Sequence, residues 1–304
     1  MELIKKYIIV FLLVLSTYSA WSQQDPQFTQ YMYNTMSVNP GYAGSREMFS
    51  ITGLYRNQWV GIDGAPETFT LGIDTPLGKN VGGGLSIIQD QLGPSQETYV
   101  DGNFSYTVHT DVDHKLSFGL KAGIRFLNVD FTKGNIEDPT DSNLQNINSE
   151  VLPTLGAGIY YHTNKWYVGF SVPNFLTSNH YDEVQGSIAA ERLHYFLIAG
   201  YVFDLNKSLK FKPAVLAKAV SGAPLSVDLS ANFLIQEKLT LGLGYRWDDS
   251  VSGLLGFQFT PGVFAGYAYD YTTSDLNSYN SGTHELMVRF DIFNNRRIKS
   301  PRFF

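Results

Sequence analysis

The chain has 304 residues, no cysteine, 16% charged residues and a formal net charge of -6. The absence of cysteine excludes a disulfide scaffold, a thiolate zinc site, an iron–sulfur cluster and cysteine catalysis. The acidic balance argues against a nucleic-acid partner, which would need a basic face to neutralise phosphates. The low charge content, together with 19 Tyr and 21 Phe, is typical of a β-rich protein with an apolar outer surface.

Residues 1–22 have the features of a secretory signal peptide. Lys5 and Lys6 precede a short apolar run, and Ala20-Trp21-Ser22 supplies small residues at the spacing of a cleavage site. A membrane anchor is the alternative, but the apolar run is well short of the roughly 20 residues of a spanning helix. We therefore expect an exported chain whose mature form begins near Gln23.

Residues 23–47 form an aromatic segment ahead of the first predicted strand. Phe28, Tyr31, Met32 and Thr35 are spaced i, i+3, i+4 and i+7, which predicts one or two helical turns. The sequence Asn39-Pro40-Gly41 then ends the helical pattern. So many aromatic side chains would not stay in water, so the segment is expected to pack inside the fold that follows or against a periplasmic partner.

Residues 48–293 alternate with period 2, which indicates strands with two different faces. In 225–235, for example, Leu225, Val227 and Leu229 share one face, whereas Ser226 and Asp228 share the other. The pattern predicts about 14 strands, each close to the roughly 9 to 11 residues that a tilted strand needs to cross a bilayer. Their predicted starts lie near residues 48, 67, 81, 97, 115, 151, 165, 191, 208, 224, 237, 250, 262 and 283.

A soluble sandwich and a membrane barrel both fit this alternation, and two features favour the barrel. Long apolar faces alternate with small, charged ones, as expected for a lipid-facing exterior around a polar lumen. The connections also alternate in length, in the outer-membrane pattern of short periplasmic turns and longer external loops. The short turns are 76–80, 109–114, 162–165, 204–208, 236–238 and 260–262, and the long loops are 131–150, 174–190 and 272–282.

The sequence thus predicts an all-β fold: a transmembrane antiparallel β-barrel at 48–293 in the outer membrane of a Gram-negative bacterium. Its exterior would contact outer-membrane lipid. Residues 23–47 would be a plug at the lumen or the periplasmic side, and residues 294–304 a basic periplasmic tail. A barrel of this size has a lumen wider than its own side chains fill, so water, a loop, a plug or a partner segment must occupy it.

The charged residues predicted for the lumen are mostly basic. They could bind an acidic partner segment or an anion, or they could form ion pairs across the lumen. We favour the ion pairs. The basic set is Arg56, Lys121, Arg125, Lys210, Lys212, Lys218, Arg246 and Arg289, and the acidic partners would be Asp74, Asp101, Asp228, Glu285 and Asp291.

The sequence contains no convincing motif for catalysis, phosphate binding or metal binding. His109 and His114 flank a turn that also holds two aspartates, but no further ligand converges on it. Residues 82–84 resemble a phosphate loop in composition only, because they lie inside a strand pattern. Ser250 beside two aspartates lacks a paired base, so a barrel-rim hydrolase has no motif to support it. We therefore expect no enzyme activity, no catalytic or metal site and no cofactor.

Four stretches carry a family resemblance. They are 25–32 (DPQFTQYM), 39–44 (NPGYAG), 55–66 (YRNQWVGIDGAP) and 281–291 (SGTHELMVRFD). In these stretches the mature chain resembles the PorP/SprF family of type IX secretion and gliding-motility outer-membrane proteins, although Gly41 stands where the family often has Ala. The resemblance implies a non-enzymatic barrel. It would bind the C-terminal domain of a secreted adhesin or other cargo and connect to periplasmic or lipoprotein subunits of the machinery.

The alternative function is a diffusion channel or transporter for anionic or lipophilic solutes, since the predicted lumen is basic. For the cargo-binding function, we expect the turn at 61–66 and the long loops to hold cargo outside, while the N-terminal segment and the tail face the periplasm. The candidate partner-binding residues are Phe28, Tyr31, Arg56, Gln58, Trp59, Asp63, Arg125, Arg246, Arg297 and Arg302.

Overall fold

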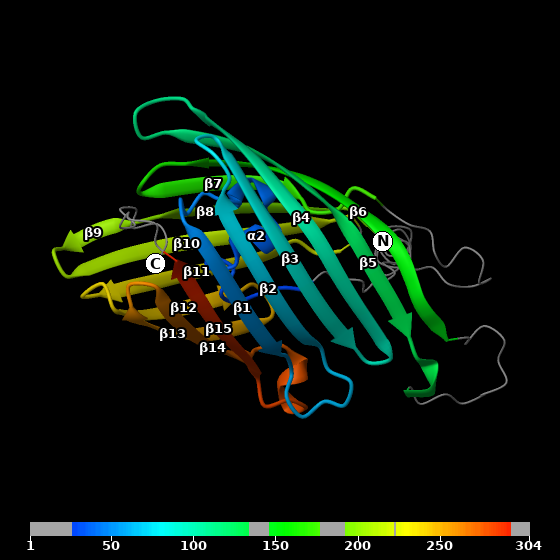
Figure 1. Cartoon of the computed structure of the whole chain (residues 1–304). Helices are drawn as coiled ribbons and strands as arrows, with labels where there is room; N and C mark the ends of the chain where they lie inside the picture. Colours follow the sequence, from blue (N-terminus) through cyan, green and yellow to red (C-terminus); the bar gives the residue numbers. More distant parts are fainter. Residues whose placement is uncertain (1–25, 134–145, 177–191, 222, 293–304) are drawn as a thin grey trace, which may run out of the picture.

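The computed structural model describes residues 26–133, 146–176, 192–221 and 223–292. They form one antiparallel sheet that closes on itself, because β1 pairs with β15 and β10 pairs with β11 (Figure 1). The strands are β1 (Phe49–Asn57), β2 (Glu67–Pro76), β3 (Val81–Leu92), β4 (Ser95–His109), β5 (Lys115–Val129), β6 (Ile147–His162), β7 (Trp166–Val172), β8 (His194–Tyr201), β9 (Phe203–Asn206), β10 (Leu209–Val220), β11 (Ser226–Ile235), β12 (Leu239–Arg246), β13 (Ser250–Thr260), β14 (Val263–Thr272) and β15 (Thr283–Ile292).

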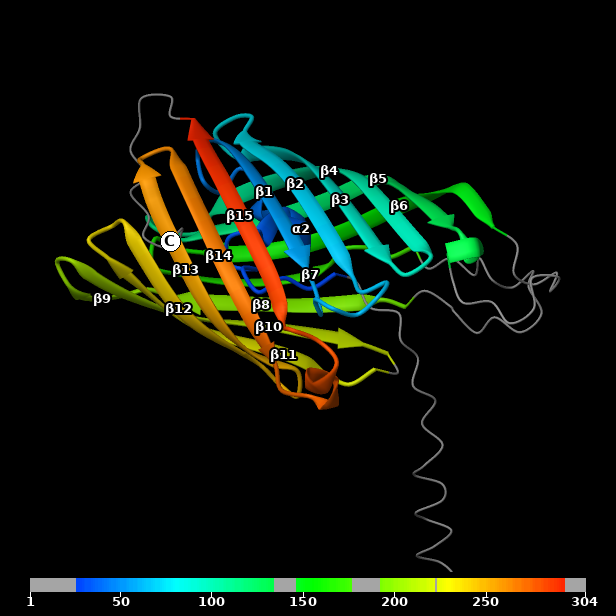
Figure 2. The same cartoon turned by 90° about the horizontal axis from the view of Figure 1, so that it is seen from below.

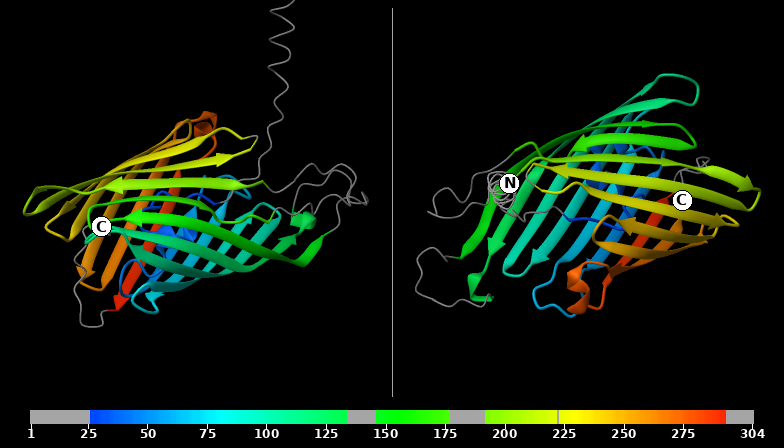
Figure 3. Two further views of the ribbon diagram at one scale, coloured as in Figure 1. Left: turned by 90° about the horizontal axis from the view of Figure 1, so that it is seen from above. Right: turned by 180° about the vertical axis from the view of Figure 1, so that it is seen from behind.

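The predicted barrel of about 14 strands is confirmed. Both β8 and β9 pair with β10, so they are two parts of one strand that is interrupted at Val202. The described residues therefore make 14 strands in the wall. Strands β4, β5 and β6 are longer than a bilayer crossing requires, with 15, 15 and 16 residues. Figure 3 shows the barrel from above and from behind, with β10–β14 in the wall opposite β2–β5.

The connections gather at two mouths. The short-turn mouth is made by 77–80, 110–114, 163–165, 207–208, 236–238 and 261–262. The long-loop mouth is made by 58–66, 93–94, 130–146, 173–193, 221–225, 247–249 and 273–282, and it carries the short helices η2 (Phe131–Lys133) and η3 (Asp275–Ser278). The predicted alternation in connection length is confirmed, although three connections at the long-loop mouth are short.

The wall has the two faces that the alternation predicts. On β5, Phe118 and Leu120 point outward and are exposed, whereas Ser117 and Lys121 are buried on the lumen side. The exposed face continues around the barrel as a belt of large apolar side chains, which is the surface a lipid bilayer solvates. None of the helices in the part of the chain described by the structure is long and apolar enough to cross a membrane.

The lumen is filled by residues 26–48, which we call the plug. It contains one turn of α-helix, α2 (Thr35–Val38), and a 3-10 turn, η1 (Pro40–Tyr42), and it lies behind β1–β3 in Figure 2. Every plug residue from Phe28 to Arg46 is buried except Ser37 and Ser45, which are half-buried. Much of the main apolar core therefore consists of plug side chains packed on lumen-facing residues. The lumen is one of the two places that the sequence analysis left open for this segment.

The helical part of the plug is a single turn, as the prediction of one or two turns allows, but it lies later in the chain than the apolar spacing indicates. Thr29 to Tyr33 form turns, and the helix begins only at Thr35. In this stretch the backbone N–H groups of Thr29 and Gln30 donate to the Glu285 carboxylate of β15, a tertiary contact that the apolar spacing does not show.

The plug runs the length of the lumen, from the long-loop mouth to the short-turn mouth. At its start, Gln27 donates to Ser226, where β11 begins at the long-loop mouth. At its end, Arg46 pairs with Asp291, where β15 finishes at the short-turn mouth. The apolar spacing of the segment could not reveal this direction, because the contacts that set it are with strands more than 190 residues away.

Two lumen glycines allow the plug backbone to approach the wall. A Cβ on Gly119 would lie 2.1 Å from the backbone N of Gly41, and one on Gly82 would lie 2.1 Å from the carbonyl O of Ala43. No side chain fits at such distances. Glycine at these two positions therefore allows η1 and Ala43 to lie directly against the wall. The triple-glycine stretch at 82–84 is thus a strand that makes room for the plug.

Candidate functional site

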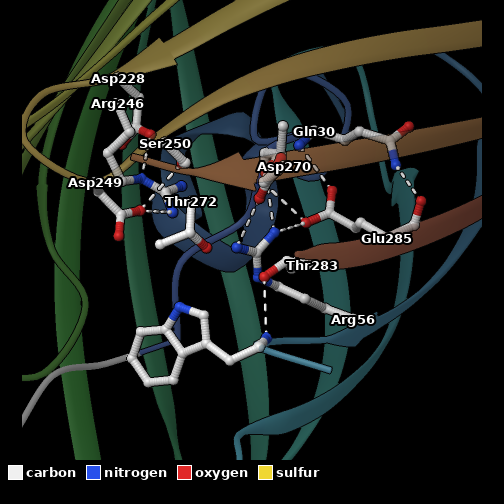
Figure 4. Close-up of polar contacts among 12 residues, drawn as sticks. Gln30, Arg56, Asp228, Arg246, Asp249, Ser250, Asp270, Thr272, Thr283 and Glu285 are labelled. Atoms are coloured by element: carbon white, nitrogen blue, oxygen red, sulfur yellow. Dashed lines mark hydrogen bonds and ion pairs between the residues drawn. The ribbon is translucent and has the colours of Figure 1, made fainter. Parts of the chain in front are cut away.

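The plug is held at the long-loop mouth by a buried cluster around Arg56. Its guanidinium lies between two carboxylates, with Nη2 2.9 Å from Asp270 Oδ2 and Nη1 2.9 Å from Glu285 Oε2 (Figure 4). The three side chains are at most 3% exposed. They come from β1, β14 and β15, and Arg56 is the cross-strand partner of Glu285, which places both on the lumen face.

The plug completes this cluster through Thr29 and Gln30. Glu285 accepts hydrogen bonds from the backbone N–H of Thr29 at 2.9 Å and of Gln30 at 2.7 Å. The Thr29 hydroxyl donates to Asp270 at 2.7 Å and accepts from Arg56 Nη1 at 2.9 Å. Charge-assisted hydrogen bonds of this kind are stronger than neutral ones, so the cluster is a strong anchor for the start of the plug.

A second buried ion pair lies beside the first. Arg246 Nε is 2.5 Å from Asp228 Oδ1, and its Nη1 is 3.3 Å from Asp249 Oδ2 (Figure 4). The neighbouring plug residue Tyr31 makes a 3.1 Å hydrogen bond between its hydroxyl and that of Ser230.

The middle of the plug is fixed through Asn39. This side chain accepts a hydrogen bond from the N–H of Gly41 at 2.9 Å, which caps η1. It also donates to the carbonyl O of Ile159 in β6 at 3.0 Å. The residue is fully buried. The stretch 39–44 that carries the family resemblance therefore has a structural role: it forms a turn that fits against the lumen wall.

The end of the plug is anchored at the short-turn mouth. Arg46 Nη2 is 2.7 Å from Asp291 Oδ2, and Arg289 Nε contacts the same oxygen at 3.2 Å. Ser50 donates to the other oxygen of Asp291 at 2.7 Å. Asp74 accepts from the backbone N–H of Gly44 at 3.0 Å. Two groups of buried charges thus hold the two ends of the plug.

Most of the basic residues predicted for the lumen form ion pairs, as the sequence analysis favoured. Beyond the anchors, Lys121 pairs with Asp101 at 3.1 Å and Arg125 with Glu97 at 3.5 Å. Lys212 lies over the ring of the plug residue Tyr33 with its Nζ 5.1 Å from the centroid, a cation–π contact. The plug supplies further partners that the sequence analysis did not assign, chiefly Arg46 and the amides of Thr29, Gln30 and Gly44.

The predicted partner-binding residues fall into three groups. Those buried within the lumen, where they seat the plug or pair with neighbours, are Phe28, Tyr31, Arg56, Arg125 and Arg246. Gln58 and Trp59 are half-buried at the long-loop mouth, and Asp63 is exposed there. Arg297 and Arg302 lie outside the described residues. A partner-binding role for all ten stays a prediction. The structure brings Phe28, Tyr31, Arg56 and Arg246 into one region of the lumen, and the backbone N–H of Trp59 donates to Thr283 beside it.

The sequence analysis did not single out Thr29, Gln30, Arg46 or Asp270 as site residues. Thr29 and Gln30 lie in the stretch 25–32, which carries part of the family resemblance, and that resemblance was the sequence feature that could have indicated them. Asp270 lies in β14, where Tyr267 and Tyr269 point outward while Ala268 and Asp270 point into the lumen, so the apolar pattern alone does not show which face is the lumen face. The family stretches 25–32, 55–66 and 281–291 meet at the Arg56 cluster.

The His109 turn has the solvated character expected of it. Residues 109–113 are exposed, and His114 contacts Tyr161 and Trp166. Across the described ranges, no three His, Asp or Glu side chains gather closely enough to hold a metal ion.

The closed antiparallel wall, its apolar belt and its ion-paired lumen define the chain as a β-barrel protein of the outer membrane. The chain belongs to the family described as type IX secretion system membrane protein PorP/SprF, whose characteristic sequence matches residues 20–290. Membership associates it with the type IX secretion machinery.

Solved barrels are similar to the chain at low identity. The outer membrane protein Omp33 of Acinetobacter baumannii is 11% identical, with a TM-score of 0.47 over 81% of this chain and 98% of that one. The CymD monoaromatic hydrocarbon channel is 12% identical, with a TM-score of 0.47 over 88% and 94%. A FadL homologue of Pseudomonas aeruginosa is 11% identical, with a TM-score of 0.44 over 88% and 95%. No curated protein matches the sequence.

Proposed function

We propose that the chain is a non-enzymatic barrel that anchors cargo of the type IX secretion or gliding machinery. It binds the C-terminal domain of a secreted adhesin or other cargo at the long-loop mouth and links it to periplasmic or lipoprotein subunits at the short-turn mouth. The observation that carries the proposal is the filled lumen of a type IX family barrel. An apolar plug that is held by buried ion pairs at both ends favours a rigid barrel that anchors a partner over an open pore.

Replacing the two longest connections at the long-loop mouth tests cargo anchoring. Neutral Gly/Ser grafts over 134–145 and 177–190 leave the described strands intact and are expected to release cargo from the cell surface. The same graft over 110–113, at the short-turn mouth, is the matched control and should leave cargo in place. Quantifying cargo on washed cells and in the medium gives the result. Full surface retention after both long-loop grafts would contradict the proposal.

The basic tail is the proposed contact to the periplasmic machinery. Exchanging Arg297 and Arg302 for Glu is expected to reduce recovery of periplasmic subunits with the detergent-solubilised barrel, because their charge would oppose an acidic partner surface. Barrel assembly should be unchanged when measured by heat-modifiable gel mobility. Equal loss of assembly and of partners would instead indicate that the tail is a folding signal.

The second candidate function is a channel or transporter, and one observation favours it. A cavity of about 750 Å³ opens at the short-turn mouth between the end of the plug and the turn at 76–82, and it is lined in part by Lys79, His109 and Lys115. Such a cavity could admit a small anion. Single-channel recording separates the two functions: the anchoring proposal expects a barrel that conducts little while the plug is seated.

A further inference from the structure

The direction of the plug has a consequence for the topology of the chain. Its first described residues lie at the long-loop mouth: Gln27 contacts Ser226, and Pro26 and Phe28 line a small cavity there with Pro173 and Arg192. Its last residues lie at the short-turn mouth, where Glu47 pairs with Lys115 at the start of β5. The chain therefore crosses the whole lumen as the plug before β1 begins at Phe49.

Three contacts in between mark the direction of the plug along the barrel. Thr29 contacts Glu285 near the start of β15, and Asn39 contacts Ile159 in β6. Gly44 contacts Asp74 near the end of β2 at the short-turn mouth. Irregular backbone at membrane depth is tolerated only where protein buries it, and nearly all of this backbone is buried. Reversing the path would break both charged anchors.

The two mouths face different compartments. In outer-membrane barrels the short turns are periplasmic and the longer loops are extracellular. The signal-peptide interpretation places the mature N-terminus near Gln23, three residues before Pro26. Three residues span at most about 11 Å when fully extended. The mature N-terminus is therefore tethered close to the long-loop mouth.

We propose that the mature N-terminus lies on the extracellular face of the outer membrane. The chain then crosses the membrane once through the interior of its own barrel before the first wall strand begins. The proposal rests on the path of the plug and not on the proposed function, so the topology does not depend on cargo.

The absence of cysteine from the natural chain allows a direct test. Single cysteines are introduced as Gln24→Cys, Tyr279→Cys and Val112→Cys, and cells are treated with a membrane-impermeant maleimide before and after lysis. Tyr279 is exposed at the long-loop mouth and Val112 at the short-turn mouth, with 74% and 90% of their surface accessible, so they mark the two faces. We expect Gln24→Cys and Tyr279→Cys to label equally in intact and lysed cells, and Val112→Cys to label only after lysis.

Each other outcome overturns the proposal. Labelling of Gln24→Cys only after lysis, alongside Val112→Cys, would place the N-terminus in the periplasm. Labelling of Gln24→Cys only after denaturation would place the N-terminus inside the lumen. Labelling of Val112→Cys in intact cells would mean that the short-turn mouth faces the outside of the cell. The labelling is repeated in a strain that lacks secreted cargo. An unchanged pattern there, whatever the loop grafts show, separates the topology from the anchoring function.

A bulky fusion gives a second measurement. A folded domain placed before Gln24 would have to pass through a lumen that the plug already fills, so we expect impaired assembly of the heat-modifiable barrel. The same domain placed after Phe304 is the control and should allow assembly. Equal assembly of both fusions, with the N-terminal domain protected from external protease, would contradict a threaded plug.

Discussion

Replacing Arg56 with methionine is expected to unseat the start of the plug and to destabilise the barrel. The change leaves Asp270 and Glu285 as two buried carboxylates without their common cation. Removing one partner of a buried ion pair typically costs about 3–5 kcal/mol, because the remaining charge is desolvated and unpaired. We expect a lower midpoint for heat-induced unfolding in gel mobility, and new conductance steps in planar bilayers as the plug leaves the lumen.

Two variants control this experiment. Lys165→Met removes an ion pair to Asp204 of the same 2.9 Å length, but that pair is exposed at the short-turn mouth and should contribute little. Combining Arg56→Met with Asp270→Asn and Glu285→Gln leaves no buried charge in the cluster and should recover much of the lost stability. If Arg56→Met behaved like Lys165→Met, the cluster would not be the anchor of the plug.

Placing a single methyl group at Gly119 is expected to displace the centre of the plug. In Gly119→Ala the new Cβ would lie 2.1 Å from the backbone N of Gly41 and 2.3 Å from the carbonyl C of Pro40. Backbone atoms cannot rotate away as a side chain can, so the turn must move. Overpacking of this kind costs about 1–3 kcal/mol. We expect faster chymotrypsin cleavage within the plug and a lower unfolding midpoint.

The matched control is Gly53→Ala in β1, where an added Cβ meets no atom within 4 Å. It makes the same chemical change in the wall without touching the plug, so protease resistance should be retained. Equal cleavage of the two variants would mean that alanine weakens any strand of this barrel and that the close approach at Gly119 has no special role.

The wall of the barrel was predictable because strand faces are a local property. The side-chain period of 2 is set by the pleat of each strand, so the lumen and lipid faces of β5 and β11 follow from the sequence alone. Most strand starts lie within three residues of those predicted. The start of β6 is earlier, at Ile147 where 151 was predicted, because the ladder with β5 continues past an irregularity at Leu127 and pairs Ile147 with Val129.

The site was only partly predictable, because its partners are far apart in sequence. Arg56 and Glu285 were both assigned to the lumen, yet their contact depends on the closure of β1 onto β15. Asp270 was missed because tyrosines alternate with small and acidic residues in β14 and blur the apolar pattern. The two family stretches in the plug were recognised as sequence, but nothing in them showed which end of the barrel they occupy.

The sequence by itself predicted an outer-membrane β-barrel with a polar lumen, an apolar exterior and an aromatic segment that had to be buried. These properties depend on composition and on short-range periodicity, whereas the type IX family was indicated by the resemblance of four short stretches. Only the tertiary structure decided that the segment threads the lumen from the long-loop mouth to the short-turn mouth. That path is fixed by charged and polar side chains, backbone groups and glycines of β1–β6, β11, β14 and β15, and these come together only when the sheet closes around the plug.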